Sequence, residues 1–377
     1  MRKYLKFVAL SLVAVLVLWW FGRNLDWAEV SASIGRADWR LIAAGVVLVW
    51  LTYLIRAYRW RAFLGPLAPG ASLREIFAAT TVGFSAIFLV GRGVGEVLRP
   101  AYLPLRDPNV RPGAAFVTIA VERIYDMTAV IVLFAANLLV FRAPGAEAAS
   151  FGRVREAGLV LLLGALAGVA VLVYLRRHTA AVTRRIDAWL TNAPALLRRA
   201  GKILTGLVEQ LSHALGVLTD ARELLVTAGW TVALWASIVA ANMLVMRAFG
   251  LPVGVSGVVF VLGWSLVGSV VPTPGGGAGT FHAATAYGMT AFLGVAETQA
   301  KAATIVLHLV VFGSALFFGA YYFLRGHVGV SRLREMSEEE RAEFEGEAHN
   351  SSAPATQGDR EAGGGPGATT ALRFDRT

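Results

Sequence analysis

Residues 114–141 read AAFVTIAVERIYDMTAVIVLFAANLLVF, an apolar run interrupted by charged side chains. A helix needs about 20 predominantly apolar residues to cross the hydrocarbon core of a bilayer. The stretch is long enough, so it predicts a helix that spans a membrane. Glu122, Arg123 and Asp126 lie within it, and Glu122 and Asp126 share a helix face because they are four residues apart. Charges at such depth are costly and usually face a bundle interior or a polar pathway.

The same pattern recurs along the chain, with charges crowded between apolar segments. We place the other segments at about 5–21, 41–58, 76–91, 157–175, 225–249, 255–272, 280–295 and 301–324. Charged residues make up 16% of the 377, whereas a soluble domain carries about 25%. The predicted fold class is all-α: a polytopic transmembrane helical bundle with about 6–9 membrane segments, one or two of them re-entrant or broken helices.

The net charge of +10 would suggest nucleic acid as the partner of a soluble protein. Here the basic residues flank apolar runs, so we interpret them as determinants of orientation that contact anionic lipid headgroups. No nucleic-acid partner is expected. The sequence contains no cysteine, which excludes disulfides and cysteine-ligated metal. No P-loop is present, and we expect no cofactor and no metal.

Lysine and arginine placement predicts the orientation of the segments. Basic residues in 1–6 place the N-terminus in the cytoplasm, and the most basic loop, 176–224, is short enough to obey the positive-inside rule. That loop stays inside only if 76–111 enters the membrane and returns to the cytoplasmic side. Residues 255–295 are either a re-entrant pair or a full hairpin. If they are re-entrant, two broken elements enter from opposite faces, as in transporters.

These assignments predict a multi-pass protein of the inner, cytoplasmic membrane with both termini in the cytoplasm. The run 5–21 ends in interfacial aromatic residues, which favours an uncleaved first span over a signal peptide. We divide the chain into a transmembrane domain, 1–330, and a disordered cytoplasmic tail, 331–377. Within the first lies a cytoplasmic amphipathic segment, 178–224, with apolar residues at helical spacing.

A glycine-rich segment at 91–100 reads GRGVGEVLRP. Its glycines, Gly95 among them, allow the backbone to bend and approach a ligand closely. Glu96 and Arg99 can share a helix face, and arginines such as Arg92 and Arg99 bind phosphate with two hydrogen bonds. The segment is a candidate headgroup site, and the alternative is a glycine turn with an interfacial ion pair.

A second glycine-rich segment, 272–282, reads PTPGGGAGTFH. It should break a helix, and a new helix beginning near Thr280 would direct its N-terminus at an anionic headgroup. Gly276, Gly277, Gly279 and His282 are the candidate site residues here, and the alternative is a flexible hairpin turn. His282 and His308 have no partners at ligand spacing, so neither predicts a metal site.

Arginine and tryptophan cluster at the cytoplasmic end of the second apolar segment, where Arg56, Arg59 and Trp60 follow one another closely. Such residues commonly anchor a helix end among lipid headgroups. We therefore assign them an interfacial role in the first instance.

Taken in order, these motifs resemble those of the lysylphosphatidylglycerol synthase transmembrane region family, over about residues 5–325. The likeness rests on the R-x-x-R-W pattern of Arg56–Trp60, G-E-x-x-R of Gly95–Arg99, E-R-x-x-D of Glu122–Asp126, and a P-G-G-x-G-like element in Pro274–Gly279. His282 stands where the family often has an acidic residue. The resemblance implies translocation of a lipid between leaflets. Full synthases add a soluble aminoacyl-transferase domain, and the short tail here makes lipid aminoacylation an unexpected activity.

The leading hypothesis is a flippase for a phospholipid or lipid-linked anionic headgroup. Its proposed phosphate ligands are Arg92, Arg99 and Arg123, and its proposed polar or proton-relaying groups are Glu96, Glu122 and Asp126. An enzyme that modifies a lipid headgroup is an alternative, less favoured because no nucleophile or metal set is recognisable. A non-catalytic regulator acting through the basic loop is another. The expected partners are membrane lipids, and a partner protein or a second copy of the chain is a further candidate.

Overall fold

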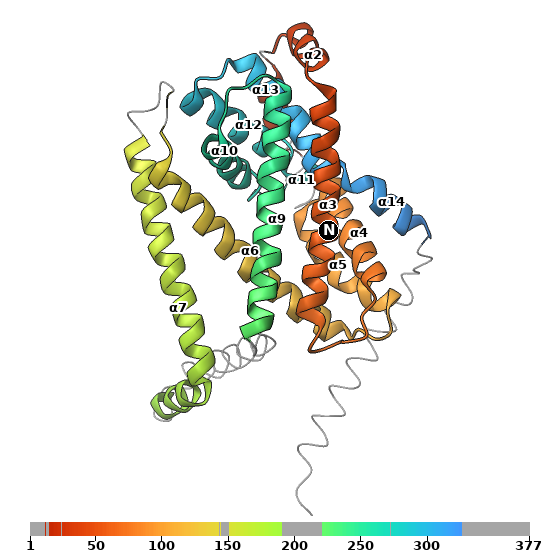
Figure 1. Cartoon of the computed structure of the whole chain (residues 1–377), viewed down its shortest axis with the longest axis vertical. Coiled ribbons are helices and arrows are strands. Elements are labelled where there is room, and N and C mark those ends of the chain that lie inside the picture. The colour runs from red at the N-terminus through yellow and green to blue at the C-terminus, as the bar shows by residue number, and fades with distance from the viewer. Residues whose placement is uncertain are drawn as a thin grey trace, which may run out of the picture. The chain divides into compact units, whose positions relative to one another are not determined.

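Every regular element in the described part of the chain is helical, which confirms the predicted all-α class (Figure 1). The computed structural model describes residues 12, 15–23, 25–142, 144, 151–190, 221–271 and 273–325. The predicted tail and residues 191–220 of the predicted amphipathic segment lie outside this part. The helix α7, Phe151–Leu190, covers the start of that segment and is kinked at His178.

The remaining described elements follow one another along the chain in this order. They are α2, Trp27–Gly35; α3, Trp39–Leu64; α4, Leu73–Leu89; α5, Arg92–Arg106; α6, Pro112–Val140; α9, Ala221–Ala248; α10, Val255–Gly268; α11, Pro274–Gly277; α12, Thr280–Tyr287; the π-helix η2, Gly288–Phe292; α13, Glu297–His308; the π-helix η3, Leu309–Gly313; and α14, Ala315–Arg325.

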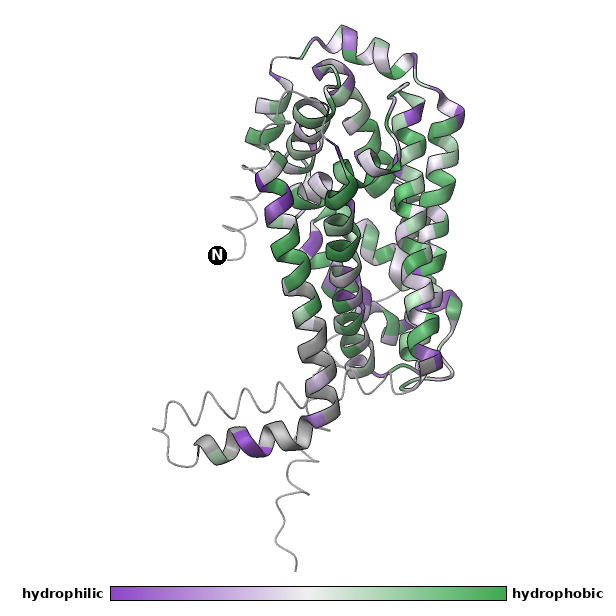
Figure 2. Cartoon of the chain, turned by 60° about the vertical axis from the view of Figure 1, so that its left-hand side comes forward, coloured by the Kyte–Doolittle hydropathy of each residue, from purple (hydrophilic) through white to green (hydrophobic). Residues whose placement is uncertain are grey.

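Four stretches among the described residues are long and apolar enough to cross a membrane. They are Trp39–Leu64, Pro112–Val140, Arg222–Ala248 and Glu297–Arg325. Figure 2 shows that the helices are largely hydrophobic along their length, with hydrophilic segments inside the bundle as well as at its ends. The protein is therefore a multi-pass helical membrane protein.

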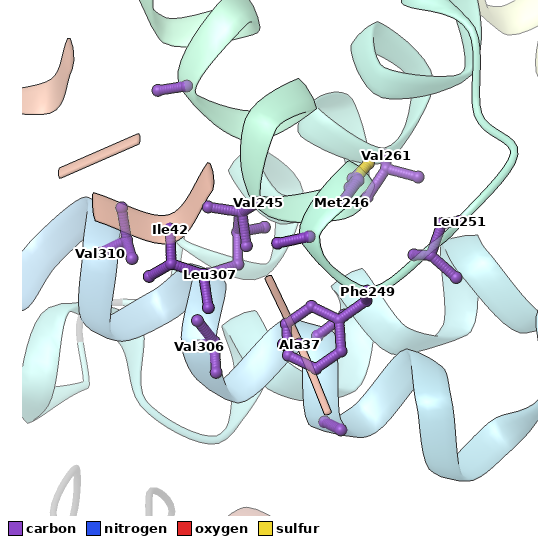
Figure 3. Close-up of a cluster of buried hydrophobic side chains, with 14 of the residues drawn as sticks. Ala37, Ile42, Val245, Met246, Phe249, Leu251, Val261, Val306, Leu307 and Val310 are labelled. Carbon is purple, nitrogen blue, oxygen red and sulfur yellow. The ribbon is translucent and has the colours of Figure 1, made fainter. Parts of the chain in front are cut away.

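The main apolar core joins α3, α9 and α13 (Figure 3). Ile42, Val245 and Leu307 are buried within it. The helix α9 packs closely on α3 at Gly45, where a Cβ would stand 3.4 Å from the Val245 side chain and 3.6 Å from the Ala241 carbonyl oxygen. Small residues at such crossings let membrane helices pack backbone to backbone. This core holds the three helices that support the polar residues described below.

The helices α4 and α5 form a hairpin that enters and leaves at one end of the bundle. Its turn is at Gly91, whose φ of 124° favours glycine. At the open end, the Ser72 amide donates to an Asp107 carboxylate oxygen at 2.7 Å, and Arg106 pairs with Glu75 at 2.7 Å. Residues 76–111 therefore return to the side from which they came, as the re-entrant prediction requires.

A second hairpin, formed by α10 with α12 and η2, enters from the opposite end. The Asp38 amide donates to the Ala248 carbonyl at 2.9 Å, and the Gln299 side chain donates to the Phe249 carbonyl at 2.7 Å. These contacts place the start of α3, the end of α9 and the start of α13 together, so α10 leaves that end and the chain returns to it. The fold thus contains two hairpins of opposite direction.

The tips of the two hairpins meet inside the bundle. A guanidinium nitrogen of Arg92 lies 3.4 Å from the Ser269 carbonyl oxygen. A Cβ built on Gly91 would stand 3.7 Å from the Thr273 carbonyl oxygen. Non-helical backbone is tolerated at membrane depth only where protein or a wet cavity surrounds it. The opposed hairpins match the re-entrant alternative for residues 255–295, which the basic residues left open, although the sequence shows no clear repeat.

The final membrane segment differs from the continuous helix expected at 301–324. The π-helix η3 separates α13 from α14, beginning directly after His308. An extra residue in a helical turn widens it, and such turns recur at functional sites. The hydropathy pattern does not reveal the switch from α-helix to π-helix, because every residue of η3 is apolar or glycine.

Candidate functional site

One face of α6 carries the polar residues around which the site is built. Thr118, Glu122 and Asp126 follow one another at intervals of four residues, so they point the same way. The structure buries all three, and Glu122 has no exposed surface. They face α3 and α5, which supply the arginines that neutralise them.

Arg99 on α5 binds Glu122 with two parallel hydrogen bonds. The donor–acceptor distances are 2.6 and 3.0 Å. The guanidinium also lies over the Trp60 ring, 4.3 Å from its centroid. Paired hydrogen bonds and an aromatic face together satisfy a planar cation in an interior where an isolated charge would be strongly unfavourable.

Arg59 on α3 bridges the two carboxylates of α6. It binds Asp126 with two hydrogen bonds of 2.6 and 3.1 Å, and its second terminal nitrogen lies 3.1 Å from Glu122. It also donates to Thr231 on α9 at 3.4 Å. One buried side chain therefore connects three membrane-spanning helices.

This position corrects the interfacial role assigned to Arg59 and Trp60. Both side chains are fully buried, and the Trp60 indole donates to the Thr118 hydroxyl at 3.0 Å. They turn inward because α6 presents carboxylates and a hydroxyl to this face of α3, and a buried carboxylate requires a cation. Arg56 is also mostly buried, 3.8 Å from Asp126, with its guanidinium over the Phe84 ring.

Arg123 carries the network outward from the buried carboxylates. Its terminal nitrogens lie 3.1 Å from Glu122, 3.6 Å from Asp126 and 3.5 Å from Glu96. Glu96 accepts a hydrogen bond of 3.0 Å from Arg92, which reaches the tip of the other hairpin. Side-chain exposure rises along this path, from 0% at Glu122 to 29% at Arg123 and 44% at Arg92. The contacts form one chain from the interior to an accessible surface.

We name the innermost group the charge centre. It comprises Arg56, Arg59, Arg99, Arg123, Glu122 and Asp126. Four guanidinium groups face two carboxylates, which is an excess of two positive charges, and adding Arg92 and Glu96 leaves this excess unchanged. The Nε atoms of all four arginines are buried without a hydrogen-bond partner in the described part of the chain. The centre therefore retains both the charge and the donors to attract an anion.

The second glycine-rich segment lies beside the charge centre rather than within it. Gly275, Gly276, Gly277 and Gly279 adopt φ values of 75°, 66°, 87° and 87°. These left-handed residues form the tip of the second hairpin, and α12 begins at Thr280, as predicted. The tip meets the network through the contact of Arg92 with the Ser269 carbonyl.

His282 packs behind this tip against His308, a contact that the sequence did not reveal. Their ring centroids are 4.5 Å apart, and the Gly279 amide donates to His282 Nδ1 at 3.3 Å. The Nε2 atom of His308 is buried and has no partner among the described residues. These two histidines are 26 residues apart in sequence, so no local spacing could join them. No group of three or more metal-ligating side chains occurs in the described ranges.

The protein is a polytopic membrane protein in which two opposed hairpins enclose a buried arginine–carboxylate network. This network is the candidate polar pathway through its interior. The sequence profile of the lysylphosphatidylglycerol synthase TM region matches residues 7–319. The chain therefore belongs to this family, as the four motifs indicated. Three of those motifs meet in the charge centre, and the fourth forms the adjacent hairpin tip.

Two relatives extend the comparison. Over 355 aligned residues the chain is 25% identical to the glycosyltransferase AglD of Haloferax volcanii. The alignment covers 89% of this chain and 56% of that relative. Over 138 aligned residues the chain is 28% identical to a UPF0104 membrane protein of Pyrococcus horikoshii. This alignment covers 35% of this chain and 39% of that relative. The chain thus spans little more than half the length of the first relative and less than half of the second.

Proposed function

We propose that this protein translocates a phospholipid or a lipid-linked anionic headgroup between the leaflets of a membrane. The observation that carries the proposal is the continuous path of charged contacts from the buried Glu122 to the accessible Arg92. A headgroup moving along this path would exchange one set of ionic partners for the next, while its acyl chains remain in lipid.

The positive excess supports an anionic cargo. Arg99 is held by two hydrogen bonds to Glu122, so we assign it chiefly to anchoring that carboxylate. Arg123 and Arg92 are more accessible and hold Glu96 between them, so a phosphate could replace this carboxylate on both arginines. The first-contact ligands in this proposal are therefore Arg92 and Arg123, with Glu96 as the displaced group.

The orientation of the proposed transporter follows from its basic residues. We propose that it resides in the cytoplasmic membrane with both termini on the cytoplasmic side. The end of the bundle that carries Arg106 would then face the cytoplasm, and the charge centre would lie nearer that face.

Leaflet exchange of fluorescent lipids in liposomes tests the proposal. The wild-type protein should accelerate exchange of an anionic lipid, and Arg123→Gln should slow it by about tenfold or more, because it removes the charge-assisted hydrogen bonds of a first-contact ligand. Glu297→Gln is the matched control, since its carboxylate is 71% exposed and pairs outside the network. Equal exchange by wild type and Arg123→Gln, with both proteins folded, would overturn the proposal.

A second candidate is a membrane-embedded enzyme that acts on a lipid-linked headgroup. The name of the Haloferax relative, a glycosyltransferase, favours it, since most of this chain aligns with part of that protein. The ion pairs of Glu122 and Asp126 argue for structural or binding roles rather than for a free catalytic base. Covalent change of the headgroup by purified protein, lost in Glu96→Gln, would favour this candidate over translocation.

A further inference from the structure

A groove of about 550 Å³ lies at the end of the bundle opposite to the charge centre. Residues of α2, the end of α9 and the start of α13 form its walls. Asp38, which lines it, precedes Arg59 by about 20 residues, which corresponds to about 30 Å of helix. The groove and the charge centre are therefore separate sites at the two ends of α3.

Tertiary hydrogen bonds hold the groove in shape. The Asp38 amide binds the Ala248 carbonyl, and the Gln299 side chain binds the Phe249 carbonyl. The Thr298 hydroxyl donates to a Glu29 carboxylate oxygen at 3.2 Å and so joins α13 to α2. These contacts connect all three walls, and the volume falls within the range of about 300–1,000 Å³ that is usual for preformed small-molecule sites.

The charged side chains of the groove are balanced in sign. Arg36 and Arg247 line it together with Glu29 and Asp38. Both carboxylates already accept hydrogen bonds, Glu29 from Thr298 and Asp38 from the Arg40 amide at 2.9 Å. In the ranges that the structure describes, neither arginine of the groove forms an ion pair. Two guanidinium groups with free donors match a phosphate, and the neighbouring carboxylates match an ammonium group.

We propose that this groove binds a zwitterionic phosphate–ammonium headgroup. Arg36 and Arg247 would hold the phosphate, and Glu29 would face the ammonium group. The groove lies where the candidate spans of α3, α9 and α13 begin or end, so it opens at the boundary of the membrane. That location is open to a lipid headgroup and to a soluble phosphodiester, and the chemistry of recognition is the same for both.

Calorimetric titration of the full chain in maltoside micelles tests this site with two probes, a short-chain phosphatidylethanolamine and free glycerophosphoethanolamine. Binding should weaken by about tenfold or more in the double variant Arg36→Ala, Arg247→Ala. Arg40→Ala is the matched control, because this arginine lies at the same end of α3 but outside the groove lining. Binding of the lipid probe alone would identify a membrane lipid as the ligand of the groove. Equal binding of both probes would identify a soluble molecule as its ligand.

The contribution of the carboxylate is tested by Glu29→Gln. This change should narrow the preference for phosphatidylethanolamine over phosphatidylglycerol, since it removes the negative charge that faces the ammonium group. Binding that is unchanged in the double arginine variant, or no binding of either probe, would overturn the proposal.

The inference stands apart from the proposed translocation. Arg123→Gln should leave binding in the groove unchanged even where it abolishes lipid exchange. Loss of probe binding in Arg123→Gln, with binding retained in the double variant, would assign the probes to the charge centre and refute the groove as their site.

Discussion

At the residue scale, the molecule is organised by the pairing of Arg99 with Glu122 and of Arg59 with Asp126. Removing two charges from water is costly, and the attraction between them offsets this cost only when geometry and hydrogen bonding are good. The bidentate contacts supply that geometry. Their excess of positive charge is not needed for pairing, which is why we assign the centre a role beyond stability.

Neutralising Glu122 should therefore destabilise the protein. Glu122→Gln leaves Arg99 and Arg59 with one fewer buried counterion, and breaking a buried pair typically costs about 3–5 kcal/mol. Thermal or denaturant unfolding in detergent measures the loss. Glu297→Gln, on an exposed ion pair, should change stability by no more than about 1 kcal/mol. Equal stability of the two variants would show that the buried carboxylate is not a structural counterion.

At the element scale, the α4–α5 hairpin depends on glycine at its helix crossing. A Cβ on Gly95 would overlap the Gly83 carbonyl oxygen and the Ile87 side chain, and a Cβ on Gly83 would approach the Arg99 Cβ to 2.7 Å. The sequence suggested Gly95 as a ligand-approach position. The structure gives it a packing role, since it brings α5 close enough to α4 to hold Arg99 against Glu122.

Gly95→Ala should force α4 and α5 apart. Overpacking of this kind typically costs about 1–3 kcal/mol, and it should also displace Arg99 and slow lipid exchange. Gly93→Ala is the matched control on the same helix, because a Cβ there meets nothing within 4 Å. Unfolding and liposome exchange would be measured for both. A Gly95→Ala protein as stable and active as Gly93→Ala would refute the close-packing argument.

At the scale of the whole molecule, two hairpins enter from opposite ends and meet at their tips. This arrangement places Gly70 and Asn109 together at one end, where a Cβ on Gly70 would lie 3.7 Å from the Asn109 side chain. Gly250, between α9 and α10, lies at the other end, next to the groove. Such symmetry is typical of transporters whose sites lie at the interface of the two halves.

Single cysteines test this arrangement cleanly, because the sequence contains none. Cysteines placed at Gly70 and Asn109 should react with an impermeant thiol reagent from the same side of the membrane. A cysteine at Gly250 should react only from the opposite side. Labelling in intact cells and in inverted vesicles also tests the proposed orientation, in which residues 70 and 109 are cytoplasmic. Opposite accessibility of residues 70 and 109 would exclude the α4–α5 hairpin.

Much of the candidate site could be read from charged residues placed where charge is unfavourable. Glu122 and Asp126 stand out because a membrane helix does not retain carboxylates without partners. The partners themselves were harder to assign. Arg59 lies near the C-terminal end of the apolar helix α3, where interfacial arginines are common. Nothing in the neighbouring sequence distinguishes an arginine that turns inward from one that reaches the headgroups.

The class of protein, the four long membrane spans and the residues of the polar motifs could be read from the sequence alone, because burying apolar length and avoiding unpaired charge are local requirements. The tertiary structure alone decided which arginine meets which carboxylate, that His282 meets His308, and that the ends of α2, α9 and α13 enclose a groove. These contacts join residues distant in sequence, and their geometry depends on how closely helices cross, which is set by packing at glycines such as Gly95 rather than by hydropathy.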